Sequence, residues 1–367
     1  MTPYVPQSLP RPDLDYGRII RKVGLANAAL ARYDGLLQSV INPSILLSPL
    51  TNREAVLSSK IEGTQATVDE VLEYEAGIDF GGEKAQDIQE IVNYRKALVL
   101  ATEALAERSL SLSLVCQMHA VLMDSVRGAN KTPGQFRVDQ NWIGSAGCTM
   151  EQATFVPPSP LQLRDHLQAW EAYLTADDFD PLVQVAIVHA QFELIHPFKD
   201  GNGRIGRLLI PLFLFQKRVL GSPMFYLSDY LESHRDLYYA RLRGISQEKD
   251  WESWIEFFLE AIVEQAHANT KKVREILALY EQMKHRIMEL TRSQHAILVL
   301  DALFDRPIFQ SSDFVLRTGI LKTTALPCLQ KLRKAGILHP LREKSGRRSA
   351  ILAFRELLNC AEGRDVL

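Results

Sequence analysis

The stretch HPFKDGNGRIGR, residues 196–207, lies between two apolar segments, LVQVAIVHAQFELI before it and LLIPLFLFQKRVL after it. The apolar segments predict two buried helices. The stretch itself is dense in Gly, Asn, Asp and His, and it predicts a loop that enters a helix at about residues 201–202. Because the first amides of a helix have no partner within the helix, such a loop leaves N–H groups at a positive helix end. The sequence therefore predicts an anion cradle between two core helices.

The charged side chains of this stretch suit a polyphosphate. Arg204 and Arg207 are three residues apart, which predicts that both project from one helix face toward the cradle and hold phosphates bidentately. Asp200 beside phosphates is explained if Mg²⁺ bridges the two. His196 titrates near neutral pH and suits a general base. A plain helix connection capped by His196 explains each residue singly, but the whole string favours phosphoryl or nucleotidyl transfer.

The same string matches the signature HPFx[D/E]GNGRxxR of the Fic family at every defined position, so the chain resembles that family. The resemblance extends to YVPQSLPRP at 4–12, SSKIEGTQAT at 58–67, GQFR at 134–137 and FVPP at 155–158. It implies a mainly α fold: a Fic helical core with a small β-hairpin flap, an N-terminal helical accessory domain and a C-terminal winged-helix domain.

Most members of that family transfer AMP from ATP to a Ser, Thr or Tyr hydroxyl of a protein, so the resemblance implies a protein adenylyltransferase that uses ATP and Mg²⁺. By the same resemblance, His196 would deprotonate the target hydroxyl, Asp200 would hold Mg²⁺, and Arg207 would hold the γ-phosphate. The cradle would consist of Gly201, Asn202, Gly203 and Arg204.

The flap and a later helix would bind the two substrates. In the flap, Asn141, Trp142 and Ile143 would receive an extended segment of the target protein as an added strand. Segment 233–245 resembles the helix that lines the adenine pocket, with Tyr238 and Tyr239, although both tyrosines are equally well explained as core aromatics. An Asn of certain relatives is Ser246 or Gln247 here, which leaves the nucleotide preference open.

SSKIEG, residues 58–63, matches the motif [S/T]xxxE[G/N], which lies on an inhibitory helix in the resembling family. A capping box TNRE at 51–54 predicts that this helix opens there, and Gly63 predicts its left-handed end. Glu62 could then reach Arg207 and occupy the place of the γ-phosphate. Ser58, one turn earlier, is expected to steady the glutamate. A second capping box, TVDE at 67–70, predicts the next helix.

We expect three domains: an N-terminal helical domain at 1–108 with the inhibitory helix at about 51–63, a catalytic core at 109–280, and a winged helix at 286–367. The flap, at about 134–160, should pair Val138–Ile143 with Thr154–Val156. The winged helix should consist of a helix-turn-helix with Gly319 in the turn, followed by two strands around the basic turn EKSGRR, 343–348.

Charge and composition limit the binding partners and the cellular location that we expect. Residues 293–367 hold 12 Lys and Arg against 7 Asp and Glu, whereas the whole chain has a net charge of −2. The basic side chains of the last domain therefore contact DNA, or dock on protein, or form only a solvated charged surface. The four widely spaced cysteines form no zinc pattern. The N-terminus lacks a signal-peptide pattern, and LLIPLFLF is too short to cross a membrane, so we expect a cytoplasmic protein without membrane contact.

Several functional alternatives remain open at this point. The same core could remove AMP from a modified protein, or transfer another phosphate-containing group. In a different class, the chain could be a transcriptional regulator that senses nucleotide with its core and binds DNA with its winged helix. The resemblance further implies a homodimer, and self-modification is compatible with the expected chemistry.

Overall fold

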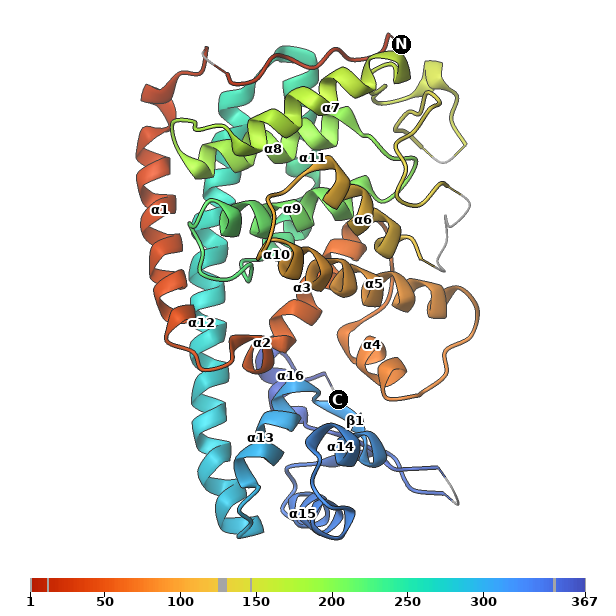
Figure 1. Cartoon of the computed structure of the whole chain (residues 1–367), viewed down its shortest axis with the longest axis vertical. Coiled ribbons are helices and arrows are strands. Elements are labelled where there is room, and N and C mark those ends of the chain that lie inside the picture. Colours follow the sequence, from red (N-terminus) through yellow and green to blue (C-terminus); the bar gives the residue numbers. More distant parts are fainter. Residues whose placement is uncertain (1, 12, 125–130, 146, 346–347, 367) are drawn as a thin grey trace. The chain divides into compact units, whose positions relative to one another are not determined.

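The computed structural model describes residues 2–11, 13–124, 131–145, 147–345 and 348–366. The fold is mainly helical, as predicted (Figure 1). The chain divides into two compact units. Unit 1 consists of the segment up to Gly35 together with Leu57–Thr64 and Gln89–His267, and unit 2 consists of Leu36–Val56, Gln65–Ile88 and the segment from Ala268 onward. Among the described residues, no helix is both long and apolar enough to cross a membrane.

The centre of unit 1 is the helix pair α8 (Pro181–Ile195) and α9 (Asn202–Gln216), which pack against each other. Asp180 caps α8 by accepting hydrogen bonds from two backbone amides of its first turn, and Pro181 follows at the first helical position. The α8 side chains are buried almost all round, as expected for a central helix. The indole N–H groups of Trp170 and Trp254 each donate to a carbonyl of α8 at 2.9 Å, so these large side chains enclose it without an unpaired donor.

The remaining helices of unit 1 surround this pair. They include α6 (Leu112–Leu122), α7 (Pro160–Thr175), α10 (Ser228–Ser233) and α11 (Arg235–Glu248). The long helices α1 (Tyr16–Gln38), α3 (Ser48–Ile61), α5 (Gly82–Ala104) and α12 (Trp251–Thr291) contribute residues to both units.

The start of α3 differs from the prediction. The helix begins at Ser48, so Thr51 lies inside it and the expected capping box at 51–54 does not form its start. Pro49 is the second helical residue, a position where the missing amide hydrogen costs nothing. The end is as predicted, because Gly63 adopts a left-handed φ of 100° just beyond Ile61.

The flap is less regular than the predicted hairpin. Its two stretches meet in antiparallel fashion where we expected them, but the described residues form a single bridge between Ile143 and Phe155. A short 3₁₀ turn, η1 (Met150–Gln152), lies between the stretches. A pair of strands without a third partner is marginally stable in water, which explains the short ladder.

Unit 2 contains α2 (Pro43–Leu46) and α4 (Val68–Glu75), the latter with the predicted capping box, in which the Thr67 amide donates to Glu70 at 2.8 Å. It continues with α13 (Ala296–Asp305), β1 (Ile308–Gln310), α14 (Ser311–Thr318) and α15 (Lys322–Lys334). Then follow β2 (His339–Arg342), β3 (Ile351–Ala353) and α16 (Arg355–Glu362).

The C-terminal part of unit 2 contains the predicted helix pair and the two strands after it, together with β1 and α16, which were not predicted. The strands form one antiparallel sheet in the order β1-β3-β2, with Leu352 opposite both Phe309 and Pro340. Gly319, in the left-handed conformation at φ 64°, makes the turn between α14 and α15. Residues 346–347 of the predicted basic turn lie outside the described residues.

The predicted domain boundaries do not coincide with the boundaries of the two units. The boundary that we expected at 280–286 falls inside α12, which continues without a break to Thr291. The segment 1–108 contributes to both units. The three-domain division therefore stays a prediction.

Candidate active site

The loop between α8 and α9 is held by its own side chains. His196 ends α8 with a left-handed φ of 50°, and Gly201 precedes α9 with a φ of 75°. The Asn202 side chain accepts a hydrogen bond from the Phe198 amide and donates one to the Phe198 carbonyl, both at 2.8 Å. Phe198 is fully buried. Asn202 thus closes the loop, whereas we had expected it to face phosphates.

Two residues outside the loop fix its position. The buried Arg137 of GQFR donates to the carbonyls of His196 at 2.9 Å and Pro158 at 2.6 Å, which ties the flap to the loop. His119 accepts a hydrogen bond from the Gly134 amide at Nδ1, at 2.8 Å, and donates one from Nε2 to the Asp200 carbonyl, at 3.0 Å. The segments that carried the family resemblance therefore support the loop structurally.

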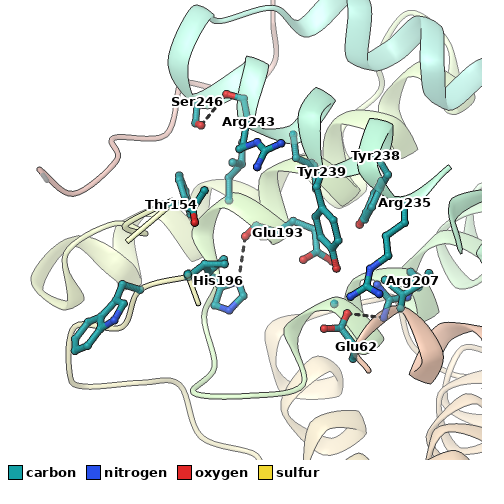
Figure 2. A pocket seen from close by; sticks show the side chains of 18 residues that line it. Glu62, Thr154, Glu193, His196, Arg207, Arg235, Tyr238, Tyr239, Arg243 and Ser246 are labelled. Atoms are coloured by element: carbon teal, nitrogen blue, oxygen red, sulfur yellow. Dashed lines mark hydrogen bonds and ion pairs between the residues drawn. The ribbon is translucent and has the colours of Figure 1, made fainter. Parts of the chain in front are cut away.

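A cavity of about 600 Å³ opens beside this loop, a volume in the usual range for a small-molecule site. It is formed by the end of α3, the flap, α8, α9 and α11 (Figure 2). The predicted site residues that line it are Glu62, Trp142, Ile143, His196, Gly203, Arg207, Tyr238 and Tyr239. The predicted residues that are not among its lining are Ser58, Gly63, Asn141, Asp200, Gly201, Asn202 and Arg204.

Arg207 and Glu62 form an ion pair at the cavity, with 2.7 Å between Arg207 Nη2 and Glu62 Oε1. Burial opposes the charge on both groups, but their mutual attraction outweighs it. The pKa of Glu62 is therefore held below its usual range, mainly by Arg207, and the pKa of Arg207 lies above its ordinary value. Both groups are charged at neutral pH.

Ser58 has a different partner from the predicted one. Its hydroxyl accepts from Arg207 Nε at 2.8 Å and its carbonyl accepts from Nη2 at 2.8 Å. It thus orients the arginine and makes no hydrogen bond to Glu62. Glu62 in turn lies against the first turn of α9, because a side-chain carbon added at Gly203 would collide with its carboxylate. The carboxylate occupies the position that the helix end and Arg207 offer to an anion.

Arg204 points away from the cavity. Its Nη1 lies 2.8 Å from the carboxylate of Glu90 on α5, and both side chains are buried. Its Nη2 lies 3.5 Å from Asp200. The expectation that Arg204 and Arg207 project together does not fit this structure, since the buried acid on a distant helix draws Arg204 to the other side.

Asp200 is the predicted Mg²⁺ ligand. One of its oxygens pairs with Lys131 at 2.9 Å, and the other accepts from the Gly201 amide at 2.7 Å. No group of three or more acidic, His or Cys side chains among the described residues could hold a metal by itself. A single, partly exposed carboxylate fits Mg²⁺ when nucleotide phosphates and water supply the other ligands.

His196 lines the cavity with its ring. Burial lowers its pKa to about 4, so the imidazole is neutral at physiological pH and can accept a proton. Its Nδ1 lies 3.3 Å from the Glu193 carbonyl (Figure 2), which leaves Nε2 as the nitrogen available for the base role.

The tyrosines of α11 differ from each other. Tyr238 is 1% exposed and its hydroxyl forms a hydrogen bond with His189 at 2.9 Å. Most of this side chain therefore belongs to the core of unit 1. His189 also bonds to the Gly206 carbonyl at 2.9 Å and is the satisfied helix histidine that its apolar surroundings predict. Tyr239 lies beside Arg235, whose guanidinium is 5.9 Å from the ring centroid, and both line the cavity.

Sequence reasoning missed three charged residues of the cavity: Glu193, Arg235 and Arg243. Glu193 had a visible signal, because it is the one charged residue in the apolar run 182–195. Burial raises its pKa to about 8, which keeps its carboxyl protonated at neutral pH. The two arginines lie on the exposed, mixed-charge face of α11, where the sequence offers no signal that separates them from surface charges.

Comparison with known proteins agrees with this geometry. Residues 20–103 match the model of the Fic/DOC family N-terminal region, and residues 109–214 match the Fic/DOC family model. The chain belongs to the Fic family. A crystal structure of a Fic family protein from Desulfovibrio desulfuricans G20 is similar in fold, with a TM-score of 0.61 at 21% identity over 96% of this chain and 98% of that chain.

Two curated relatives are similar in sequence over part of their length. A protein adenylyltransferase Fic from Aedes aegypti is 26% identical over 52% of this chain and 35% of its own length. A probable protein adenylyltransferase from Aquifex aeolicus is 27% identical over 52% of this chain and 56% of its own length. The aligned region thus spans about a third to just over a half of these relatives.

Proposed function

We propose that the protein is an adenylyltransferase, which transfers AMP from ATP to a Ser, Thr or Tyr hydroxyl of a target protein and releases pyrophosphate. The observation that carries this proposal is the arrangement in one cavity of a neutral His196, the N-terminus of α9 at Gly203, and Arg207. These groups are a base, an anion site and a fixed cation, the three parts that nucleotidyl transfer needs. The relatives named protein adenylyltransferases support the same reaction.

In the proposed reaction, His196 Nε2 takes the proton of the target hydroxyl, whose oxygen forms a bond to the α-phosphorus as the bond to the β-phosphate oxygen breaks. Arg207 and the amides at the start of α9 hold the phosphates and stabilise their charge. Asp200 would hold Mg²⁺, which neutralises phosphate charge when bound. The flap, next to His196, would align the target segment through backbone hydrogen bonds.

We further propose that Glu62 inhibits this reaction. Its carboxylate is an anion bound at Arg207 and at the end of α9, and the γ-phosphate of ATP would need the same place. Two anions cannot share one guanidinium edge without a repulsion of several kcal/mol at short range. ATP would therefore bind weakly, or in a pose unsuited to attack, until Glu62 leaves.

The test uses the full chain with Glu62→Gly, incubated with Mg²⁺ and ATP labelled at the α- or the γ-phosphorus. Label retained on protein from α-labelled but not from γ-labelled ATP, and lost when His196→Ala is added, supports the transfer of AMP. Absence of α-label from both the protein itself and an added cell extract would overturn the proposal. Homodimer formation and DNA binding by residues 286–367 stay predictions.

A further inference from the structure

Glu193 lines the cavity with a carboxyl group of which one oxygen, Oε1, has no hydrogen-bond partner in the part of the chain that the structure describes. It lies on α8, the central apolar helix. Its Oε1 is shielded from solvent. An unsatisfied buried polar atom costs about 1–3 kcal/mol. A ligand that reaches Oε1 and donates a hydrogen bond to it would recover that cost.

Arg207 is not that partner in this structure. Its guanidinium is occupied by Glu62 and Ser58, and it forms no ion pair with Glu193 within the part of the chain that the structure describes. The carboxyl instead packs on Gly206 of α9, where a side-chain carbon would collide with Oε1. The raised pKa keeps the group uncharged, which removes the repulsion toward Glu62 and leaves it able both to accept and to donate.

The place of Glu193 along the cavity indicates which part of a nucleotide it would meet. Figure 2 shows Glu193 between the Arg207–Glu62 pair on one side and the Arg243–Ser246 end of the pocket on the other. In ATP the ribose lies between the phosphates and the base. With the phosphates at Arg207, the ribose would face Glu193, and an acidic side chain is a well-known partner of ribose hydroxyls in nucleotide sites.

Resting on the proposed function, we propose that Glu193 binds a ribose hydroxyl of the nucleotide and selects ribonucleotides over deoxyribonucleotides. A site that hydrogen-bonds a hydroxyl rejects the analogue that lacks it, because its own polar group is then left unpaired. A neutral hydrogen bond of about 1.4 kcal/mol corresponds to a tenfold difference in affinity.

The experiment measures nucleotide binding by calorimetry to the full chain with Glu62→Gly, which frees Arg207, and His196→Ala, which prevents turnover. ATP, 2′-deoxy-ATP and 3′-deoxy-ATP are compared with Glu193 intact and with Glu193→Leu or Glu193→Gln. We expect ATP to bind about tenfold more tightly than one of the deoxynucleotides. Glu193→Leu should lower the affinity for ATP to that for this analogue and leave the affinity for the analogue unchanged. Glu193→Gln keeps a hydrogen-bond acceptor and should retain part of the difference in affinity.

A matched control is Glu107→Leu, an exposed glutamate of the same unit outside the cavity, which should leave all three affinities unchanged. Equal binding of the three nucleotides with Glu193 intact would overturn the inference. So would an equal loss for all three with both Glu193 variants, which would mark a structural role. If the protein discriminates between the riboses but Glu62→Gly, with His196 intact, transfers no label, the proposed reaction is overturned and the role of Glu193 stands. If ATP does not bind, both the proposed reaction and the role of Glu193 are overturned.

Discussion

The ion pair between Glu62 and Arg207 joins side chains of very different exposure. The Arg207 side chain is 1% exposed and donates hydrogen bonds to the hydroxyl and the carbonyl of Ser58. The Glu62 side chain is 34% exposed and lines the cavity. The glutamate is therefore the partner that can leave. An incoming phosphate would compete with Glu62 for an arginine that is already oriented, without any need to build a new cation site.

Removal of the Glu62 carboxylate should activate the protein. In Glu62→Gly, Arg207 and the end of α9 lose their internal anion and become available to ATP. A charge-assisted hydrogen bond contributes about 1.5–3 kcal/mol, so we expect ATP affinity and the rate of α-label transfer to rise by about tenfold or more. Calorimetric titration with ATP and the initial rate of labelling are the two measurements.

Glu107→Gln is the control for this change, because it removes an exposed glutamate of the same unit that does not line the cavity. It should leave both readouts unchanged. Wild-type behaviour of Glu62→Gly would show that Glu62 does not inhibit, whatever its contact with Arg207.

Two neighbouring serines of α3 allow a matched test of how Arg207 is held. Both are fully buried, but the Ser58 hydroxyl accepts from Arg207 Nε, whereas the Ser59 hydroxyl has no hydrogen-bond partner among the described residues. Ser58→Ala should lower the free energy of unfolding by about 1–3 kcal/mol, while Ser59→Ala should be neutral or slightly stabilising. Urea unfolding followed by tryptophan fluorescence measures this, since all four tryptophans belong to unit 1.

The two serines should differ in function as well. In the Glu62→Gly background, Ser58→Ala removes the hydroxyl that accepts from Arg207 Nε and keeps only the carbonyl that accepts from Nη2, so ATP affinity should fall while Ser59→Ala has no effect. Equal stability and equal ATP binding of the two variants would show that Ser58 does not position the arginine.

The parts of the site that could be predicted are contiguous in the sequence. The loop 196–207 and the end of α3 near Gly63 follow from local rules, because helix starts, helix ends and glycine conformations depend on neighbouring residues. The same rules locate the pairing of Ile143 with Phe155. They misplace the start of α3, which begins at Ser48, before the expected cap at Thr51, with Pro49 in a first turn that tolerates proline.

The parts that could not be predicted depend on residues far apart in the sequence. A spacing of three residues places Arg204 and Arg207 near each other on α9, but it says nothing about Glu90, 114 residues earlier, which draws Arg204 away. In the same way, Ser58 was assigned to steady Glu62, its helix neighbour, although it bonds to Arg207, 149 residues later. Both contacts depend on which residues the tertiary fold places next to each arginine, and spacing within one helix does not contain this information.

Gly203 offers a double-mutant test of the position of the Glu62 carboxylate. A methyl group at Gly203 would collide with Glu62 Oε1, so Gly203→Ala should destabilise the wild-type chain by about 1–3 kcal/mol. In Glu62→Gly the colliding atoms are absent, and the cost should largely disappear, apart from a closer contact with Arg207. The coupling free energy between the two changes, from urea unfolding of the four variants, is expected to be 1 kcal/mol or more, as an order-of-magnitude estimate. Simple additivity would contradict the carboxylate's placement against α9.

The buried histidines predict that unit 1 loses stability in acid. Burial lowers the pKa of His119 to about 4 and that of His189 to about 3, whereas an unfolded histidine titrates near 6.5. Below about pH 6.5 the unfolded chain therefore binds more protons than the folded chain. The free energy of unfolding should fall as the pH drops from there toward 4, by up to about 1.4 kcal/mol per pH unit for each histidine.

Urea unfolding at pH 7, 6 and 5, followed by tryptophan fluorescence, measures this slope. His189→Gln keeps polar contacts toward Gly206 and Tyr238 but cannot titrate, so its slope between pH 6 and 5 should be smaller by about one proton, or about 1.4 kcal/mol per pH unit. His234→Gln, which replaces an exposed histidine of the same unit, is the matched control. A wild-type slope in His189→Gln would mean that His189 does not carry the acid sensitivity.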